Sequence, residues 1–133
     1  MFAVLLSALM AFSPQNLVQK AIPSSAFESV EASREIVLVK FDPSTGQCTE
    51  STLKKFEKNE MIILKSYLLD DSSYYFDKTK TCPFIPQYAL KFSDSDDVIV
   101  LISPSGKQLK FKVGDQSKIL DYDPMANYLN QFL

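Results

Sequence analysis

The sequence predicts an α+β fold: an antiparallel sheet of four to five strands, with one core helix and a short C-terminal helix on one face. Short turns connect the strand-like segments, most clearly within residues 88–113. No alternation of strand and helix of the kind that builds a parallel sheet runs through the chain. A helix start signal, Asp123-Pro124, precedes the last amphipathic segment.

Size and composition indicate a single folded domain. The chain has 133 residues, of which 46% are hydrophobic and 23% charged, close to the averages for globular proteins. The formal net charge is −2, and acidic and basic residues are mixed along the chain. A nucleic-acid partner is therefore not expected, because phosphate binding requires a basic stripe or patch.

The first 21 residues are typical of a signal peptide. An apolar or small run from Phe2 to Phe12 has about half of the ~20 residues that a membrane-spanning helix needs. No Lys or Arg precedes Lys20, so a packed N-terminal helix is the alternative interpretation. We expect a bacterial protein that is exported and is either secreted or periplasmic. It should not stay inserted in the membrane after the signal peptide is removed.

Two cleavage sites have the small residues that signal peptidase prefers. Ala11 and Ser13 form one of them, but Pro14 would follow the cut and hinder it. Residues 18–21 form the better site, which makes Ile22 the first residue of the mature chain.

The first half of the mature chain divides into a lead-in and three elements. Residues 22–33 have no steady period and predict a flexible lead-in, so that the single domain spans residues 34–133. Residues 35–41 predict a strand covered on both faces, and a turn at residues 42–46 sends the chain back. Residues 47–56 are then a second strand, with a helix as the alternative.

A core helix and a long loop follow. Asn59 is a suitable N-cap, and apolar residues at helical spacing predict a helix over residues 60–69. The polar stretch after it, up to residue 87, is predicted to be a long loop.

The second half of the chain predicts a three-stranded meander over residues 88–113, because two short turns in succession force antiparallel neighbours. In the C-terminal helix, four side chains share one face that should lie on the sheet: Met125, Tyr128, Leu129 and Phe132. Asn130 lies on the opposite face of this helix.

The sequence excludes much catalytic chemistry. It contains no His, which removes the usual nucleophile activation and proton transfer near neutral pH. Three dispersed glycines cannot form a phosphate loop. Asp94, Asp96 and Asp97 resemble the start of a calcium loop without its later ligands, so neither a metal nor a cofactor is predicted.

Cys48 and Cys82 are the only cysteines, and an even count permits one disulfide in an oxidising compartment. The alternative is two buried free thiols, because the predicted elements that carry these residues are not obvious neighbours.

Aromatic side chains in the long loop are the candidate binding residues. Tyr74, Tyr75, Phe76 and Phe84 lie where an exposed aromatic surface would contact a partner. The alternative is that these rings fold back as a lid on the sheet.

One stretch of sequence resembles small exported bacterial proteins of uncharacterised function. It consists of residues 67–71 and 82–92, where a helix, a loop and a Cys-x-Phe-x-Pro segment lead into an antiparallel meander. The resemblance covers about residues 59–113 and implies export and fold, with no activity to transfer.

Two hypotheses for the function follow. The first is a non-enzymatic binding module of the cell envelope, whose partner is an unknown protein or envelope component. The second is a His-free enzyme, which requires two acidic side chains in one cleft. The acidic candidates are Asp94, Asp96, Asp97, Asp121 and Asp123.

Overall fold

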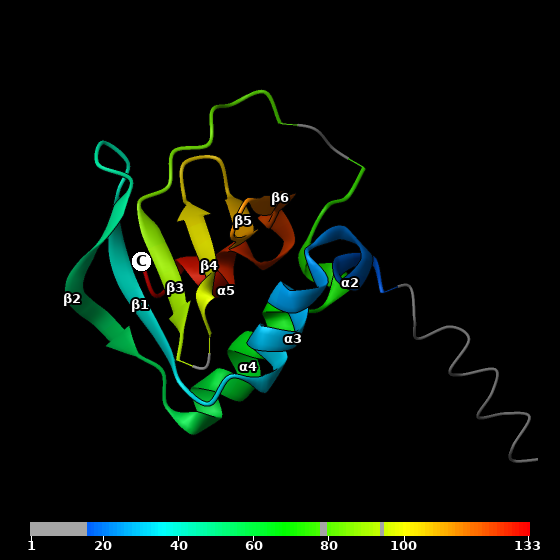
Figure 1. The fold of residues 1–133 in the computed structure, drawn as a ribbon. Coiled ribbons are helices and arrows are strands. Elements are labelled where there is room, and N and C mark those ends of the chain that lie inside the picture. The colour runs from blue at the N-terminus through cyan, green and yellow to red at the C-terminus, as the bar shows by residue number, and fades with distance from the viewer. Residues whose placement is uncertain (1–15, 78–79, 94) are drawn as a thin grey trace, which may run out of the picture.

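The structure is a computed structural model that describes residues 16–77, 80–93 and 95–133 (Figure 1). Its first half contains α2 (Leu17–Ala21), α3 (Ser24–Ala32), β1 (Ile36–Asp42), β2 (Gln47–Lys55), α4 (Lys58–Leu68) and the 3-10 helix η1 (Asp71–Ser73). Its second half contains β3 (Tyr88–Phe92), β4 (Ser95–Ser103), β5 (Gln108–Val113), β6 (Gln116–Asp121), the 3-10 helix η2 (Asp123–Met125) and α5 (Ala126–Asn130).

The strands form one antiparallel sheet in the order β2-β1-β3-β4-β5-β6. The predicted α+β class and the meander are confirmed, but the sheet has six strands where four to five were expected. The additional strand is β6, which follows a turn at Gly114 with a φ of 55°. Its first four residues are exposed, so it lacks the apolar alternation by which a strand is recognised in a sequence.

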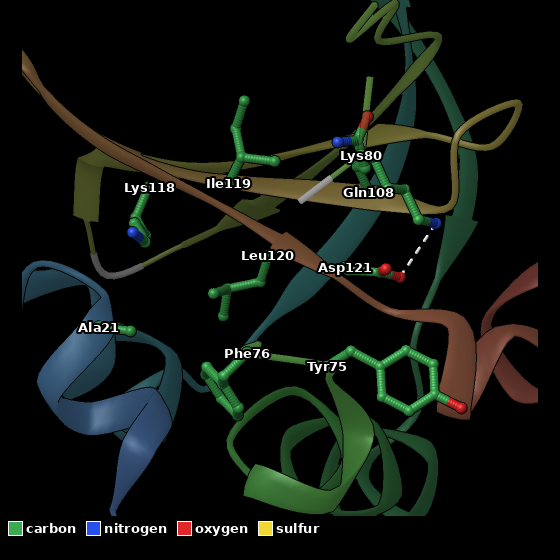
Figure 2. A pocket seen from close by; sticks show the side chains of 9 residues that line it. All are labelled: Ala21, Tyr75, Phe76, Lys80, Gln108, Lys118, Ile119, Leu120 and Asp121. Atoms are coloured by element: carbon green, nitrogen blue, oxygen red, sulfur yellow. Dashed lines mark ion pairs between the residues drawn. The ribbon is translucent and has the colours of Figure 1, made fainter. Parts of the chain in front are cut away.

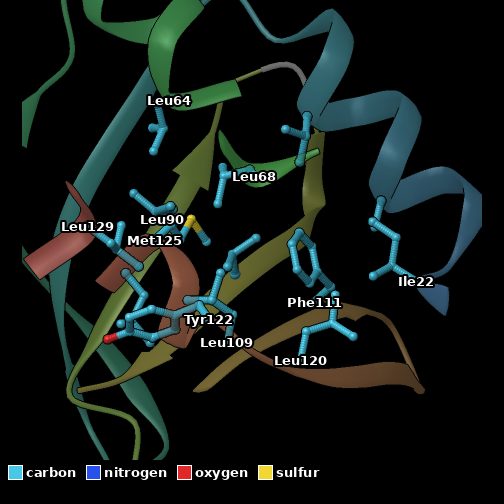
Figure 3. Packing of buried hydrophobic residues seen from close by; sticks show 14 of the residues in the cluster. Ile22, Leu64, Leu68, Leu90, Leu109, Phe111, Leu120, Tyr122, Met125 and Leu129 are labelled. Atoms are coloured by element: carbon cyan, nitrogen blue, oxygen red, sulfur yellow. The ribbon is translucent and has the colours of Figure 1, made fainter. Parts of the chain in front are cut away.

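One face of the sheet carries the main core, and we call it the helix-covered face. Side chains from α2, α3, α4, η2 and α5 pack there with those of the strands, and Figure 3 shows part of this cluster. Leu90 and Phe111 from the strands, Leu64 from α4 and Leu129 from α5 are all at most 1% exposed. A long connection leads from η1 to β3 and arches over one end of the sheet (Figure 1).

The opposite face is covered only in part, and we call it the loop-covered face. Val39, Ala89 and Leu101 are cross-strand neighbours and form a small buried cluster there. Phe84 from the long loop packs on this cluster, and the ammonium group of Lys110 lies 4.9 Å from the centre of the Phe84 ring. The alternative for the loop aromatics, that they fold back on the sheet, thus holds on this face for Phe84. Tyr74 and Phe76 fold back on the core of the other face.

The predicted lead-in at residues 22–33 is wrong in its local structure. Helix α3 occupies most of this segment and buries Ala26 and Val30 in the core, and Ile22 is buried just before it. The prediction failed because polar residues interrupt the few apolar positions, whose packing partners lie on strands that are distant in the sequence.

Helix α2 lies inside the predicted signal segment. Val18 is fully buried, and its backbone N–H donates to Asp71 Oδ1 at 2.9 Å while that of Leu17 donates to Oδ2 at 3.0 Å. The apolar run from Phe2 to Phe12 lies outside the described residues. A cut after Ala21 would remove a helix that contributes to the core.

The predicted core helix and the predicted C-terminal helix are both confirmed, but their first and last residues differ from the prediction. Helix α4 begins one residue before Asn59 and is capped by Glu57, which exchanges side-chain and backbone hydrogen bonds with Glu60. At the C-terminus, η2 precedes α5, and Met125 and Leu129 are buried on the sheet as expected. No helix among residues 16–77, 80–93 and 95–133 is long and apolar enough to cross a membrane.

Candidate functional site

The aromatic residues predicted to form a binding surface do not form one patch. Tyr74 is 4% exposed and its hydroxyl donates to the Leu68 carbonyl at 2.6 Å, so it is a core residue. Burial raises the pKa of Tyr74 well above its ordinary value. Phe84 lies on the loop-covered face, whereas Tyr75 and Phe76 both line a pocket at the edge of the sheet.

This edge pocket has a volume of about 420 Å³ and lies along the edge strand β6 (Figure 2). Its lining residues are Ala21, Tyr75, Phe76, Lys80, Gln108, Lys118, Ile119, Leu120 and Asp121. The backbone N–H of Tyr75 donates to the carbonyl of Asp121 at 3.0 Å and forms an isolated antiparallel bridge. This bridge holds the aromatic wall of the pocket against the end of β6.

A buried polar row on the loop-covered face leads into the pocket. Ser103, Gln108 and Asp121 are cross-strand neighbours on β4, β5 and β6, and none is more than 8% exposed. The loop crosses the first two, because the Ile85 N–H donates to Ser103 Oγ at 3.1 Å and Cys82 Sγ lies 4.0 Å from Gln108 Oε1. Asp121, the third member, lies where the row reaches the pocket.

Lys80 connects the loop to the acidic end of this row. Its Nζ lies 3.0 Å from Asp121 Oδ1 and 3.1 Å from Asp123 Oδ1, and it also donates to the Gly106 carbonyl. Burial alone would lower the pKa of Lys80, but the two carboxylates outweigh burial and raise the pKa above its ordinary 10.5. Lys80 therefore stays charged at neutral pH and neutralises one of the two carboxylates.

One oxygen of Asp121 has no partner. Its Oδ1 accepts from Lys80 and from the Asp123 N–H at 3.0 Å, but Oδ2 is buried and accepts no hydrogen bond among the residues that the structure describes. A buried carboxylate oxygen without a donor costs free energy, so such a group is normally satisfied by a protein, water or ligand donor. Because Asp121 lines the edge pocket, this unmet requirement for an N–H or O–H group lies in the wall of the pocket.

Gly106 permits the close packing beside the polar row. A Cβ at this position would lie 2.8 Å from Gln108 Oε1 and 3.0 Å from Cys82 Sγ, so these two side chains would have to shift to accept it. The carbonyl of Gly106 accepts from Lys80 at the same place, where the β4–β5 turn meets the loop.

Both cysteines are free, so the disulfide that the cysteine count permits is not present. Cys48 lies on β2 at one end of the sheet, while Cys82 is exposed and lies over β5, with β1, β3 and β4 between them. Burial raises the pKa of the Cys48 thiol, with a smaller opposing effect from Lys91. Both thiols are free, but the expectation that they are buried is wrong, because Cys48 is half-buried and Cys82 is exposed.

The candidate acids do not all converge. Asp121 and Asp123 meet at Lys80, Asp97 is exposed on β4, and the side chains of Asp94 and Asp96 lie outside the part of the chain that can be described. Among the described residues, no group of three or more His, Cys, Asp or Glu side chains could hold a metal ion.

Sequence reasoning found the aromatic wall of the pocket but missed Lys80, Gln108 and Ser103 as a connected set. Polar residues at the ends of strands are usually turn residues, and their pairing is visible only once the register of β4, β5 and β6 is known. A usable signal was the clustering of polar residues at three successive strand ends that a long loop could cover.

Comparisons of the chain with family models, curated proteins and solved structures found no match. The edge pocket is therefore the feature of this protein that bears on its function.

Proposed function

We propose that this protein is an exported, non-enzymatic binding module of the cell envelope, secreted or periplasmic, and that the edge pocket is its binding site. The single observation that carries this proposal is the buried Asp121 Oδ2 without a hydrogen-bond partner, in a pocket of about 420 Å³. A ligand that donates to this oxygen would remove the desolvation cost of the carboxylate.

The charges around Asp121 favour a cationic donor. Lys80 carries one positive charge against the two negative charges of Asp121 and Asp123. An ammonium or guanidinium group would balance the remaining charge, and charged hydrogen bonds are stronger than neutral ones. Tyr75 and Phe76 offer aromatic rings to the apolar part of the same ligand.

The class of partner follows from this chemistry. An amine of an envelope component, or a Lys or Arg side chain of another protein, has both the donor and the aliphatic stem that the pocket requires.

Export is part of the proposal, with the cleavage site placed earlier than residue 21. The contacts of Val18 and Leu17 make α2 a part of the domain, which favours a cut before Leu17. Ala11 and Ser13 offer the small residues for such a cut, and Pro14 after it should make cleavage slow. The intact mass of the protein recovered from the periplasm or medium should then correspond to a chain that begins before Leu17. A full-length cytosolic product would contradict export, and a chain beginning at Ile22 would contradict the earlier cut.

Three probes of similar size test the pocket: butylammonium, butanol and butyrate, each titrated while backbone amide shifts are recorded by NMR. We expect butylammonium to shift the amides of Tyr75, Phe76 and Asp121 at the lowest concentration, and butyrate to leave them unchanged. Asp121→Asn should weaken butylammonium binding about tenfold or more, whereas Asp97→Asn, at an exposed position of β4, should not.

Because Asp121 also accepts the Asp123 N–H, its replacement can disturb the local fold. Tyr75→Ser leaves the carboxylate in place, removes the ring from the wall of the pocket, and should also weaken butylammonium binding. Equal responses to the cation and the anion, or no response to either, would refute the proposed site.

The alternative function, a His-free enzyme, requires a carboxyl group that can exchange a proton with a substrate. Asp121 and Asp123 do converge, but Lys80 already binds one oxygen of each. This ion pairing favours binding over catalysis.

A further inference from the structure

Helix α4 carries apolar side chains on two sides. Leu64 and Leu68 are fully buried against the sheet, as the inner face of a surface helix should be. Ile62 and Ile63 are nonetheless 62% and 49% exposed, and Tyr67 is 38% exposed. These three residues, together with the nearby cations Arg34, Lys58 and Lys65, are called the α4 surface below.

The cations lie at a groove next to Ile62. This groove has a volume of about 350 Å³ and is lined by Ser33, Arg34, Lys58, Met61, Ile62 and Lys65. Three of its six lining residues are positively charged and none is negatively charged. The ammonium group of Lys65 donates to the carbonyls of Glu31 and Ser33, which holds its charge at the end of α3.

Three carboxylates near the groove have partners. Glu35 lies 3.6 Å from the ammonium group of Lys55, and Glu60 lies 2.8 Å from that of Lys54. Glu57 caps the first turn of α4. Lys58, in contrast, has no ion pair among the described residues, so the groove has an excess of positive charge.

From this arrangement we infer that the α4 surface docks onto a lipid bilayer that contains anionic phospholipids. Ile62 and Ile63 enter the headgroup region, while Lys58 and Lys65 contact lipid phosphates. Exposed apolar side chains flanked by cations are the chemistry of peripheral membrane binding, and the charge complementarity selects anionic lipid over a neutral apolar partner. The α4 surface shares no residue with the edge pocket, so the inference goes beyond the proposed function.

The test is co-sedimentation of the full chain with vesicles of phosphatidylcholine alone, or of phosphatidylcholine mixed with phosphatidylglycerol. We expect at least about tenfold tighter binding to the mixed vesicles, since each cation near an anionic surface contributes severalfold. Ile62→Ser combined with Ile63→Ser, and separately Lys58→Glu, should each weaken this binding about tenfold.

Matched controls are available on β5 and β6. Ile119→Ser and Lys112→Glu change an exposed Ile and an exposed Lys outside the α4 surface, and binding to the mixed vesicles should be unaffected. All of the altered side chains are exposed, so circular dichroism should show an intact fold in each variant.

Three results would overturn the inference. These are equal binding to both vesicle types, no binding to either, or an equal loss in the control variants. Laurate below its micellar concentration separates a bilayer from a free amphiphile: if laurate binds and the vesicles do not, the groove accepts single amphiphiles and the docking inference is wrong.

Discussion

The two faces of the sheet are closed in different ways. On the helix-covered face, side chains from α2, α3, α4, η2 and α5 form one continuous apolar cluster. On the loop-covered face, the buried apolar cluster has only three strand residues, and a row of buried polar side chains replaces apolar packing at one end. The comparison indicates that the helices supply most of the stability, whereas the loop shapes the candidate site.

This difference has a physical basis. Burying apolar surface is non-directional and increases with area, so a face covered by helices tolerates small shifts. Buried polar groups require specific partners at short distances, as Lys80 provides for Asp121 and Asp123. A site that depends on such contacts is therefore expected on the polar side of the sheet.

Removing one large ring from each face gives the largest contrast. Phe111→Ala should lower the free energy of unfolding by about 3–5 kcal/mol, because Phe111 is fully buried among the helices. Phe84→Ala should cost about 1 kcal/mol, since that ring is only half-buried under Lys110. Urea unfolding of the two variants measures this contrast, and equal losses would show that the loop contributes as much stability as the helices.

Truncation tests whether α2 belongs to the helix-covered face. A chain that lacks residues 1–21 should be less stable than one that lacks residues 1–15 by about 2–4 kcal/mol, because it loses the buried Val18 and the partners of Asp71. The shorter truncation is the reference, since both lack the same apolar run. Indistinguishable thermal midpoints would mean that α2 packs without contributing to the fold.

A polar contact within the helix-covered face gives a smaller effect. The hydroxyl of Tyr122 donates to Asn130 Oδ1 at 2.9 Å, so Asn130→Ala should cost about 1 kcal/mol. From the sequence, Asn130 was simply a residue on the outer face of the C-terminal helix. Asn127→Ala, at an exposed position of α5, should stay within about 0.5 kcal/mol, and a similarly small change for both variants in urea would contradict a role for this contact.

The smallest expected effect on the free energy of unfolding comes from the ionisation of two buried tyrosines, and it is measured at alkaline pH. Burial raises the pKa of Tyr122 and of Tyr128 to about 12, with added effects from Asp123 on the first and from Tyr67 and Glu60 on the second. Because the pKa in the fold exceeds the ordinary 10.0, this stabilisation is complete below pH 10.0 and is lost as the pH rises to about 12. Tyr128→Phe should therefore show a shallower fall in unfolding free energy over this range, and an unchanged slope would argue against burial of its hydroxyl.

The parts of the fold that were predicted correctly have signals close together in the sequence. The β3–β4–β5 meander follows from short turns between apolar strands, and the C-terminal helix follows from Asp123, Pro124 and the spacing of Met125 and Leu129. Such patterns depend on neighbouring residues only.

The parts that were missed depend on partners distant in the sequence. Helix α3 has small and polar residues on most of its surface, and its burial depends on strands that come later in the chain. The polar row of Ser103, Gln108 and Asp121 requires the register of three strands together with the position of Lys80. Neither feature leaves a local pattern.

The segment from Lys80 to Ile85 touches β4, β5 and β6 through one polar contact for each strand. Because these contacts are few and lie away from the helix-covered face, natural selection could exchange the residues of this segment one at a time without rebuilding the core. The fold would then serve as a constant frame whose ligand preference changes between descendants, and related chains would differ most between residues 80 and 85.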